Sequence, residues 1–162
     1  MIIFTVYMAT VNILFVCYGN TCRSPMASAL LKKKIKERGL FGKIKCDSCG
    51  ISANVGEEMT QNAELALKEL GVGVFKHTSK KFELNALKKN KLILTMTNAI
   101  KDTICSSCFG AFNVHSLCDY VSGEEIPDPY GKSLQEYLSV ARYLDYLMDR
   151  VLDKVIKEYH IE

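Results

Sequence analysis

The chain has 162 residues, 48% of them hydrophobic and 24% charged, which suits one globular domain and leaves too little sequence for two. Its formal net charge of +3 is too small to favour nucleic acid as a partner. Lysines cluster at residues 32–34, 80–81 and 88–91, and these clusters are predicted to lie on solvated faces.

The cysteine content and the apolar N-terminal stretch indicate the compartment. Seven cysteines, an odd number in a chain of this size, favour reduced thiols over a disulfide scaffold. Residues 1–16 have no basic n-region and no cleavage site, and they are too few to cross a membrane. A cytoplasmic protein without a membrane partner is expected. Residues 1–10 are predicted to be an extension of uncertain order before a single domain over residues 11–160.

The first predicted element is a buried strand over residues 11–16, a continuous apolar run of the parallel type. It leads into a loop at residues 17–25 with the sequence Cys-Tyr-Gly-Asn-Thr-Cys-Arg-Ser-Pro. A helix is predicted next, because Ser24 can cap it, Pro25 suits its first position and Gly39 can end it.

The rest of the chain continues to alternate between the two kinds of element. Strands are predicted over residues 44–48, 91–97 and 112–117, and helices over residues 60–70, 98–106 and 133–157. Thr60 is expected to cap the second helix and Gly71 to end it. The last helix carries an apolar stripe assigned to the core, formed by Leu134, Tyr137, Leu138, Ala141, Leu144, Met148, Leu152 and Val155.

This alternation predicts an α/β fold. We expect a single-domain three-layer sandwich, in which a four-stranded parallel sheet has helices on both faces. The loop at residues 17–25 would connect strand 1 to helix 1. Ligands of such sheets bind beyond the carboxyl ends of the strands, so function is expected at this loop.

The loop has the features of a phosphate cradle, because backbone N–H groups and a helix N-terminus can converge on one anion. Gly19 lets the backbone approach the anion, and Asn20 tolerates left-handed backbone angles. Arg23 offers a planar fork that matches two phosphate oxygens. The predicted phosphate-binding residues are Tyr18, Gly19, Asn20, Thr21, Cys22, Arg23 and Ser24.

Cys17 is the predicted nucleophile. The positive field of the cradle acts on its sulfur, so its pKa is expected to fall below the ordinary value, and Ser24 can donate a further hydrogen bond. The alternative is a buried structural cysteine beside a surface arginine. The position between an apolar strand and a helix favours the catalytic interpretation.

The proton donor is predicted in residues 126–131, with the sequence Ile-Pro-Asp-Pro-Tyr-Gly. Two prolines fix the backbone around Asp128, and the loop follows the last strand, where it can overhang the sheet end. A general acid is needed there to protonate the leaving group. A plain turn is the alternative, and the cysteine loop favours the acid.

Together, residues 17–27 and the Asp-Pro-Tyr motif at residues 128–130 resemble the low-molecular-weight protein tyrosine phosphatase family. The likeness runs from about Val11 to the terminal helix. It implies that Cys17 forms a phosphocysteine intermediate, that Arg23 binds phosphate and that Asp128 acts as acid and then base. It implies a phosphorylated protein as the partner and neither metal nor cofactor, and it leaves the oligomeric state open.

The resemblance also assigns supporting roles. The residues expected to hold the loop through hydrogen bonds are Asn20, Ser24, Ser48 and His77. Cys22 matches the second loop cysteine of the family, which can form a reversible disulfide with Cys17. A small buried thiol is the alternative for Cys22.

The leaving group is the open question. Thr21 replaces a bulky aliphatic residue, and with Thr97 and the spacing from Val121 to Asp128 it resembles the bacterial protein-arginine phosphatase branch. A hydroxyl in the pocket suits a polar guanidinium, whereas aromatic walls suit a phenyl ring. The predicted wall residues are Tyr18, Thr21 and Tyr130. Phosphotyrosine is the predicted substrate and phosphoarginine the alternative.

Two other functions are less favoured. Related proteins on this fold reduce arsenate with two extra thiols near the end of the third strand, where this chain has Thr97 and places Cys105 and Cys108 further on. A four-thiolate zinc site formed by these two cysteines with Cys46 and Cys49 would need pairs much further apart than in zinc ribbons.

Overall fold

A computed structural model describes residues 9–162. Its centre is a four-stranded sheet in the order β2-β1-β3-β4, and every neighbouring pair is parallel. The strands are β1 (Val11–Cys17), β2 (Ile44–Gly50), β3 (Leu92–Thr95) and β4 (Val114–Ser116). The parallel sheet predicted from the sequence is confirmed.

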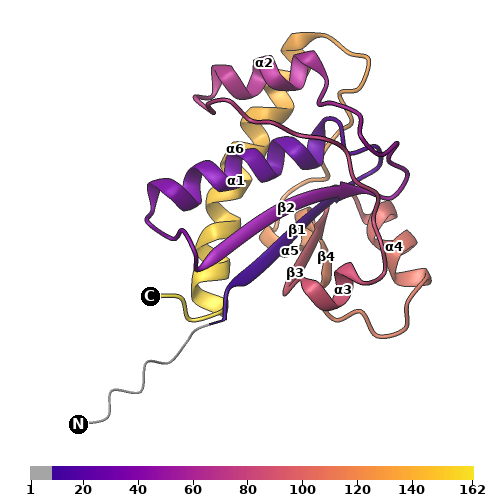
Figure 1. The fold of residues 1–162 in the computed structure, drawn as a ribbon, viewed down its shortest axis with the longest axis vertical. Coiled ribbons are helices and arrows are strands. Elements are labelled where there is room, and N and C mark those ends of the chain that lie inside the picture. Colours follow the sequence, from indigo (N-terminus) through magenta and orange to yellow (C-terminus); the bar gives the residue numbers. More distant parts are fainter. Residues whose placement is uncertain (1–8) are drawn as a thin grey trace.

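Helices complete the three layers. They are α1 (Arg23–Glu37), α2 (Gln61–Glu69), α3 (Ala86–Lys89), α4 (Asn98–Ser106), α5 (Leu117–Val121) and α6 (Leu134–Glu158). On one face of the sheet α1 and α6 pack against each other, with α2 against both, and α3 and α4 lie towards the other face (Figure 1). The predicted α/β class is confirmed.

Burial explains why β1 and β3 are continuous apolar runs. Both strands lie inside the sheet with helices on either side, and Phe15 and Leu94 are completely buried. The stripe on α6 is also core, except that Leu134 is exposed at the start of the helix and Leu138 is only partly buried. Ser133 precedes it as the N-cap in a capping box with Glu136.

The start of α1 differs from the prediction. The helix begins at Arg23 with Cys22 as its N-cap residue, so Ser24 and Pro25 lie inside its first turn. The physical reason is that the Ser24 hydroxyl is used in the loop and does not cap the helix. Gly39, with φ 68°, follows the end of this helix as predicted.

The second helix follows the prediction more closely. Thr60 is the N-cap residue of α2, although its side chain makes no capping hydrogen bond. Gly71, with φ 75°, lies just beyond the helix end. The Thr60 hydroxyl instead donates to the phenol oxygen of Tyr137 at 3.3 Å.

The region around the last two strands has shorter strands and more helices than predicted. β3 and β4 are shorter than the strands predicted over residues 91–97 and 112–117, and Phe112 is exposed. Two short helices, α3 and α5, were not predicted. A single turn leaves no detectable periodicity, and α5 begins directly after β4, where the Ser116 hydroxyl accepts the Asp119 N–H.

One lysine contradicts the prediction of solvated clusters. Lys34 is buried between α1 and α6, where its Nζ lies 3.0 Å from Asp145 Oδ1 and 2.8 Å from Asp149 Oδ2. Two carboxylates surround this ammonium group and compensate for its loss of hydration. The lysine therefore connects two helices of the core.

The N-terminal extension predicted over residues 1–10 lies outside the described residues, apart from its last two. Of these, Thr10 donates a hydrogen bond from its hydroxyl to the Gly42 carbonyl oxygen at 2.9 Å. Within residues 9–162, no helix combines the length and the apolar character that crossing a bilayer requires.

Candidate active site

Cys17 is the last residue of β1 and lies at the carboxyl edge of the sheet, 2% exposed. Its Sγ lies 2.8 Å from Ser24 Oγ and accepts the Asn20 N–H at 3.2 Å. The N-terminus of α1 begins six residues later, at Arg23. The sulfur therefore lies inside the loop, where positive backbone dipoles converge.

The pKa of Cys17 does not follow the prediction. Burial raises the pKa of the thiol above its ordinary value, while the hydrogen bonds of Ser24, the charge of Arg23 and the Asn20 N–H lower it. Desolvation of the thiolate outweighs these contacts, so the predicted lowering is wrong for this structure. Considered apart from burial, the hydrogen bonds and the charge of Arg23 favour the thiolate over the thiol, but the net effect is a raised pKa.

Ser24 can serve either state of the sulfur. Its Oγ lies 3.2 Å from the Cys49 carbonyl oxygen as well as 2.8 Å from Cys17 Sγ. A hydroxyl has a single proton, which it can donate to the carbonyl while the thiol donates to Oγ. When the sulfur is ionised, the same proton can turn to the thiolate.

Asn20 is the centre of the hydrogen-bond network behind the loop. It is completely buried and has φ 57°, in the left-handed region. Its Nδ2 donates to Ser24 Oγ at 2.9 Å and to Ser48 Oγ at 3.0 Å. Its Oδ1 accepts the Lys80 N–H at 2.9 Å, and His77 Nε2 lies 2.7 Å from its carbonyl oxygen. The structure thus brings together all four residues expected to hold the loop.

His77 is a neutral partner in this network. Burial lowers the pKa of its imidazole below the ordinary value. The Asn20 carbonyl can only accept, so His77 Nε2 donates the hydrogen bond. The ring of Phe75 stacks on the imidazole, with centroids 6.3 Å apart. These contacts place a donor on the outside of the loop without adding charge to it.

The close backbone approach expected at Gly19 is found at Gly50 instead. Gly19 has no left-handed φ, and a Cβ there would meet only Thr21 Oγ1, at 3.9 Å. Gly50, which sequence reasoning missed, allows no side chain at all. A Cβ at Gly50 would lie 2.5 Å from the Tyr18 carbonyl oxygen and 3.0 Å from the Asn20 nitrogen. Its only signal in the sequence was a glycine close after the predicted second strand.

Arg23 joins the loop to the predicted proton donor. Its guanidinium is buried and donates from NH1 to the Ile126 carbonyl at 3.2 Å and from NH2 to Asp128 Oδ2 at 3.0 Å. The Asp128 side chain is 50% exposed, and its Oδ1 accepts the Tyr130 N–H at 3.2 Å. Two motifs more than a hundred residues apart therefore meet in one site.

A cavity of about 290 Å³ lies between the two loops. The predicted residues that line it are Cys17, Tyr18, Gly19, Asn20, Thr21, Cys22, Arg23, Asp128 and Tyr130. Ser52, Asn54 and Glu57 also line it and were not predicted, because residues 51–60 carry no motif that points to the site. Tyr18 and Tyr130 are largely exposed, whereas Thr21 is buried in the wall.

Comparison with known proteins identifies this arrangement. The family model for low molecular weight phosphotyrosine protein phosphatases matches residues 12–160. The chain belongs to this family. A protein-arginine-phosphatase of Geobacillus stearothermophilus is 36% identical over 91% of this chain and 97% of its own length. A low molecular weight protein-tyrosine-phosphatase of Acinetobacter johnsonii is 34% identical over 74% of this chain and 80% of its own length.

The solved structures agree with the family assignment. The arginine phosphatase from Geobacillus stearothermophilus superposes with a TM-score of 0.83, at 34% identity, over 91% of this chain and 94% of its own. Membership of this phosphatase family makes the protein a hydrolase, as the sequence predicted. The conclusion rests on the match along nearly the whole domain.

Cys22 of this phosphatase is held by contacts outside the loop. The thiol is buried, and its Sγ lies 3.2 Å from Tyr137 OH and 3.5 Å from Thr60 Oγ1. Burial and the neighbouring Cys22 raise the pKa of Tyr137 to about 12. All seven cysteines are free thiols in this structure, so a disulfide between Cys17 and Cys22 stays a prediction.

The structure does not form the alternative thiolate site. Within residues 9–162, no three histidine, cysteine or acidic side chains group closely enough to hold a metal ion. Cys46 faces α1, where its thiol donates to the Ser28 carbonyl at 3.5 Å, whereas Cys105 is exposed near the end of α4. The zinc hypothesis therefore has no support in the described part of the chain.

Proposed function

We propose that this phosphatase hydrolyses phosphoarginine in proteins through a phosphocysteine intermediate. The observation that carries the mechanism is that Cys17, Arg23 and Asp128 line one cavity of about 290 Å³. The cavity provides a nucleophile, an anion-binding fork and a proton donor in one place. This combination is what phosphoryl transfer to sulfur requires.

In the first step the Cys17 thiolate attacks phosphorus. The S–P bond forms while the bond from phosphorus to the guanidino nitrogen breaks, and Asp128 gives its proton to that nitrogen. Arg23 leaves its contacts with Asp128 and Ile126 to bind the phosphoryl oxygens, and the N–H groups of the loop bind them too. The release of Asp128 from Arg23 frees its carboxyl group for proton transfer.

In the second step water attacks the phosphocysteine. The Asp128 carboxylate takes a proton from the water, the new O–P bond forms and the S–P bond breaks. The electron pair of that bond returns to Cys17 as a thiolate. Ser24, 2.8 Å from the sulfur, donates a hydrogen bond from its hydroxyl to the developing negative charge.

The walls of the cavity support phosphoarginine as the substrate. The side chain of Thr21 provides a hydroxyl, whereas an aliphatic side chain there would leave a buried guanidino group without a hydrogen-bond partner. Glu57 adds a carboxylate, which attracts a cationic guanidinium group. Two relatives at 36% and 35% identity, from Geobacillus stearothermophilus and Bacillus subtilis, are named protein-arginine-phosphatases.

Phosphotyrosine is the second candidate, because aromatic residues flank the cavity. Tyr18 and Tyr130 are 57% and 69% exposed, one on each loop. Such side chains can stack on a phenol leaving group. The relative from Acinetobacter johnsonii is named a protein-tyrosine-phosphatase.

Kinetics of the wild type and of one Thr21 variant distinguish the two candidate substrates. We expect the wild type to hydrolyse phosphoarginine peptides with the higher kcat/KM, and Thr21→Ile to shift the ratio towards phosphotyrosine by about tenfold or more. Matched peptides that differ only in the phosphorylated residue provide the comparison. A preference of the wild type for phosphotyrosine would reject arginine, and an unchanged ratio in the variant would show that Thr21 does not select the substrate.

A further inference from the structure

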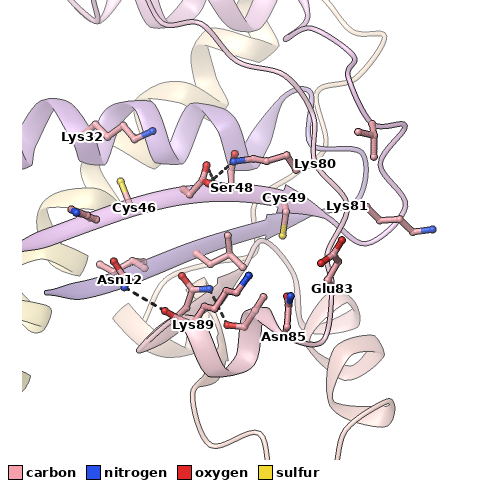
Figure 2. Close-up of a pocket in the computed structure, with 17 residues that line it drawn as sticks. Asn12, Lys32, Cys46, Ser48, Cys49, Lys80, Lys81, Glu83, Asn85 and Lys89 are labelled. Atoms are coloured by element: carbon pink, nitrogen blue, oxygen red, sulfur yellow. Dashed lines mark hydrogen bonds and ion pairs between the residues drawn. The ribbon is translucent and has the colours of Figure 1, made fainter. Parts of the chain in front are cut away.

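A second concave surface lies along the outer edge of the sheet, beside β2. It encloses about 760 Å³ between the sheet, α3 and the segment at residues 80–83, and we call it the basic cleft (Figure 2). Leu14 of β1 and Cys49 of the edge strand β2 line it together with Ala86 of α3. Among residues 9–162 no further strand pairs with β2 on this side, so β2 is the edge strand of the described sheet.

Lysines surround the basic cleft from several directions. Its lining carries only two carboxylates, Asp47 and Glu83, against five exposed lysines: Lys32, Lys45, Lys80, Lys81 and Lys89. The surplus of three positive charges equals the formal net charge of the whole chain. The charged residues outside the cleft therefore sum to zero, and the net positive charge of the chain equals that of this one surface.

Most of these ammonium groups have no counter-ion among residues 9–162. Lys80 pairs with Asp47. By contrast, no carboxylate of residues 9–162 lies within ion-pair distance of Lys45, Lys81 or Lys89. Figure 2 shows Lys81 and Lys89 extending from separate segments around the cleft. These uncompensated positive charges would attract an anionic partner.

The open edge of β2 adds a backbone template. Gly50 donates to the Lys80 carbonyl at 2.9 Å and accepts the Phe82 N–H at 2.8 Å, which covers the carboxyl end of the strand. Peptide groups two residues apart on a strand point to the same side, so those of Ser48 and Cys46 also point away from β1. The Ser48 N–H is bonded to Asp47 Oδ1 at 2.8 Å, which leaves the Ser48 carbonyl and both peptide groups of Cys46 for an added strand. An extended peptide can pair with such an edge.

The basic cleft adjoins the active site. The segment at residues 51–57 separates the two, with Ser52, Asn54 and Glu57 lining the active-site cavity and Val55 lining the cleft. Ser48 and Lys80 also line the cleft and hydrogen-bond to Asn20 of the phosphate loop. A chain bound in the cleft can therefore continue over this segment to the reacting phosphoryl group.

We propose that the basic cleft is an exosite for an acidic, extended segment next to the phosphorylated residue of the protein substrate, a proposal that rests on the proposed phosphatase function. Charge complementarity argues for an acidic occupant and the open strand edge for an extended one. A single-stranded nucleic acid fits less well, because no aromatic side chain of residues 9–162 lines the cleft for bases to stack on.

Direct binding tests the cleft without any catalysis. The probe is an unphosphorylated, fluorescein-labelled peptide rich in glutamate, measured by anisotropy against the triple variant Lys45→Glu, Lys81→Glu, Lys89→Glu. We expect binding about tenfold weaker than in the wild type and a loss of affinity with added salt. The matched control, Lys36→Glu, Lys68→Glu, Lys157→Glu, carries the same charge change on exposed lysines outside the cleft and should bind as the wild type does.

Three binding results would overturn the proposal. They are equal weakening in both triple variants, tighter binding of single-stranded oligonucleotides than of the peptide, and tighter binding to vesicles of anionic lipid. Because the probe carries no phosphate, each result is readable even if the protein hydrolyses neither phosphoarginine nor phosphotyrosine. Thermal melting verifies that both triple variants are folded.

Kinetics then test the link to the active site. A glutamate-rich flank on a phosphopeptide should lower KM about tenfold in the wild type, with kcat unchanged, and this advantage should disappear in the cleft variant. Turnover of p-nitrophenyl phosphate, which is too small to reach the cleft, should be the same in both proteins. If the glutamate-rich flank still lowers KM in the cleft variant, the exosite proposal is wrong.

Discussion

The two loops that form the active-site cavity differ in how firmly they are held. The loop at residues 17–24 is buried apart from Tyr18 and Gly19, and Asn20 and Ser24 have no exposed surface. The loop at residues 126–131 is held by fewer contacts, its Asp128 side chain is half exposed and Tyr130 is 69% exposed. One loop is part of the core and the other lies on its surface.

This difference follows from what each loop does in the proposed mechanism. The nucleophile and the anion-binding groups must keep a fixed geometry, so buried hydrogen bonds that cannot exchange with water hold them. The proton donor has to exchange protons with the leaving group and with water, which an exposed loop permits. Substitutions in the first loop should therefore affect both stability and chemistry, and those in the second mainly chemistry.

The largest effect is expected for Cys17→Ser. Hydrolysis should fall by more than about 10⁴-fold, because a serine hydroxyl is a far weaker nucleophile than a thiolate. Phosphate binding, measured by calorimetry, should persist because Arg23 and the loop amides remain. Turnover that is measurable above background, after contamination is excluded, would contradict the proposed phosphocysteine intermediate.

Asp128→Asn should come next, with a fall of about 10²–10⁴-fold in kcat. The loss should grow as the leaving group becomes more basic, which a series of aryl phosphates measures. Thermal unfolding should show a stability change below about 1 kcal/mol, because the Arg23–Asp128 pair is half exposed on its acidic side. An equal loss across the series would exclude Asp128 as the acid, and a large loss of stability would break the contrast between the loops.

Asn20→Ala tests the buried loop through stability. The substitution removes three side-chain hydrogen bonds and places alanine at φ 57°, so the free energy of unfolding should fall by about 3 kcal/mol. Asn20→Gly is the matched control, because glycine tolerates this φ and isolates the hydrogen-bond loss. Chemical denaturation measures both, and a change in Asn20→Ala no larger than that of Asp128→Asn would argue against a rigid first loop.

The smallest and most specific effect is expected for Ser24→Ala. The hydrogen bonds of Ser24 lower the pKa of Cys17, so removing the hydroxyl should raise that pKa further. The rising limb of the profile of kcat/KM against pH should move to higher pH, with the loss of activity greatest on the acidic side. Ser48→Ala, which removes another partner of Asn20 without contacting the sulfur, should leave the position of that limb unchanged. Equal shifts in both variants would show that Ser24 acts only through the loop.

Local patterns predicted the strand–loop–helix unit and one later helix well. The strand–loop–helix unit that carries Cys17 depends on a continuous apolar run and a motif within one short segment, and α4 was predicted with its observed bounds of residues 98–106. The start of α1 was misplaced because the Ser24 hydroxyl contacts sulfur instead of capping the helix. The helix α3 was missed because four residues are too few to show a period.

The sequence by itself determined the kind of chemistry, since Cys17 and Arg23 lie in one loop whose spacing already implies an anion site. Tertiary structure alone decided what depends on distant segments meeting. It placed Asp128 3.0 Å from Arg23, packed Gly50 against the loop, gathered lysines from four segments into the basic cleft and buried Cys17 enough to raise its pKa. Spacing along a chain fixes neighbours within a loop, whereas contact and desolvation depend on every element that packs around it.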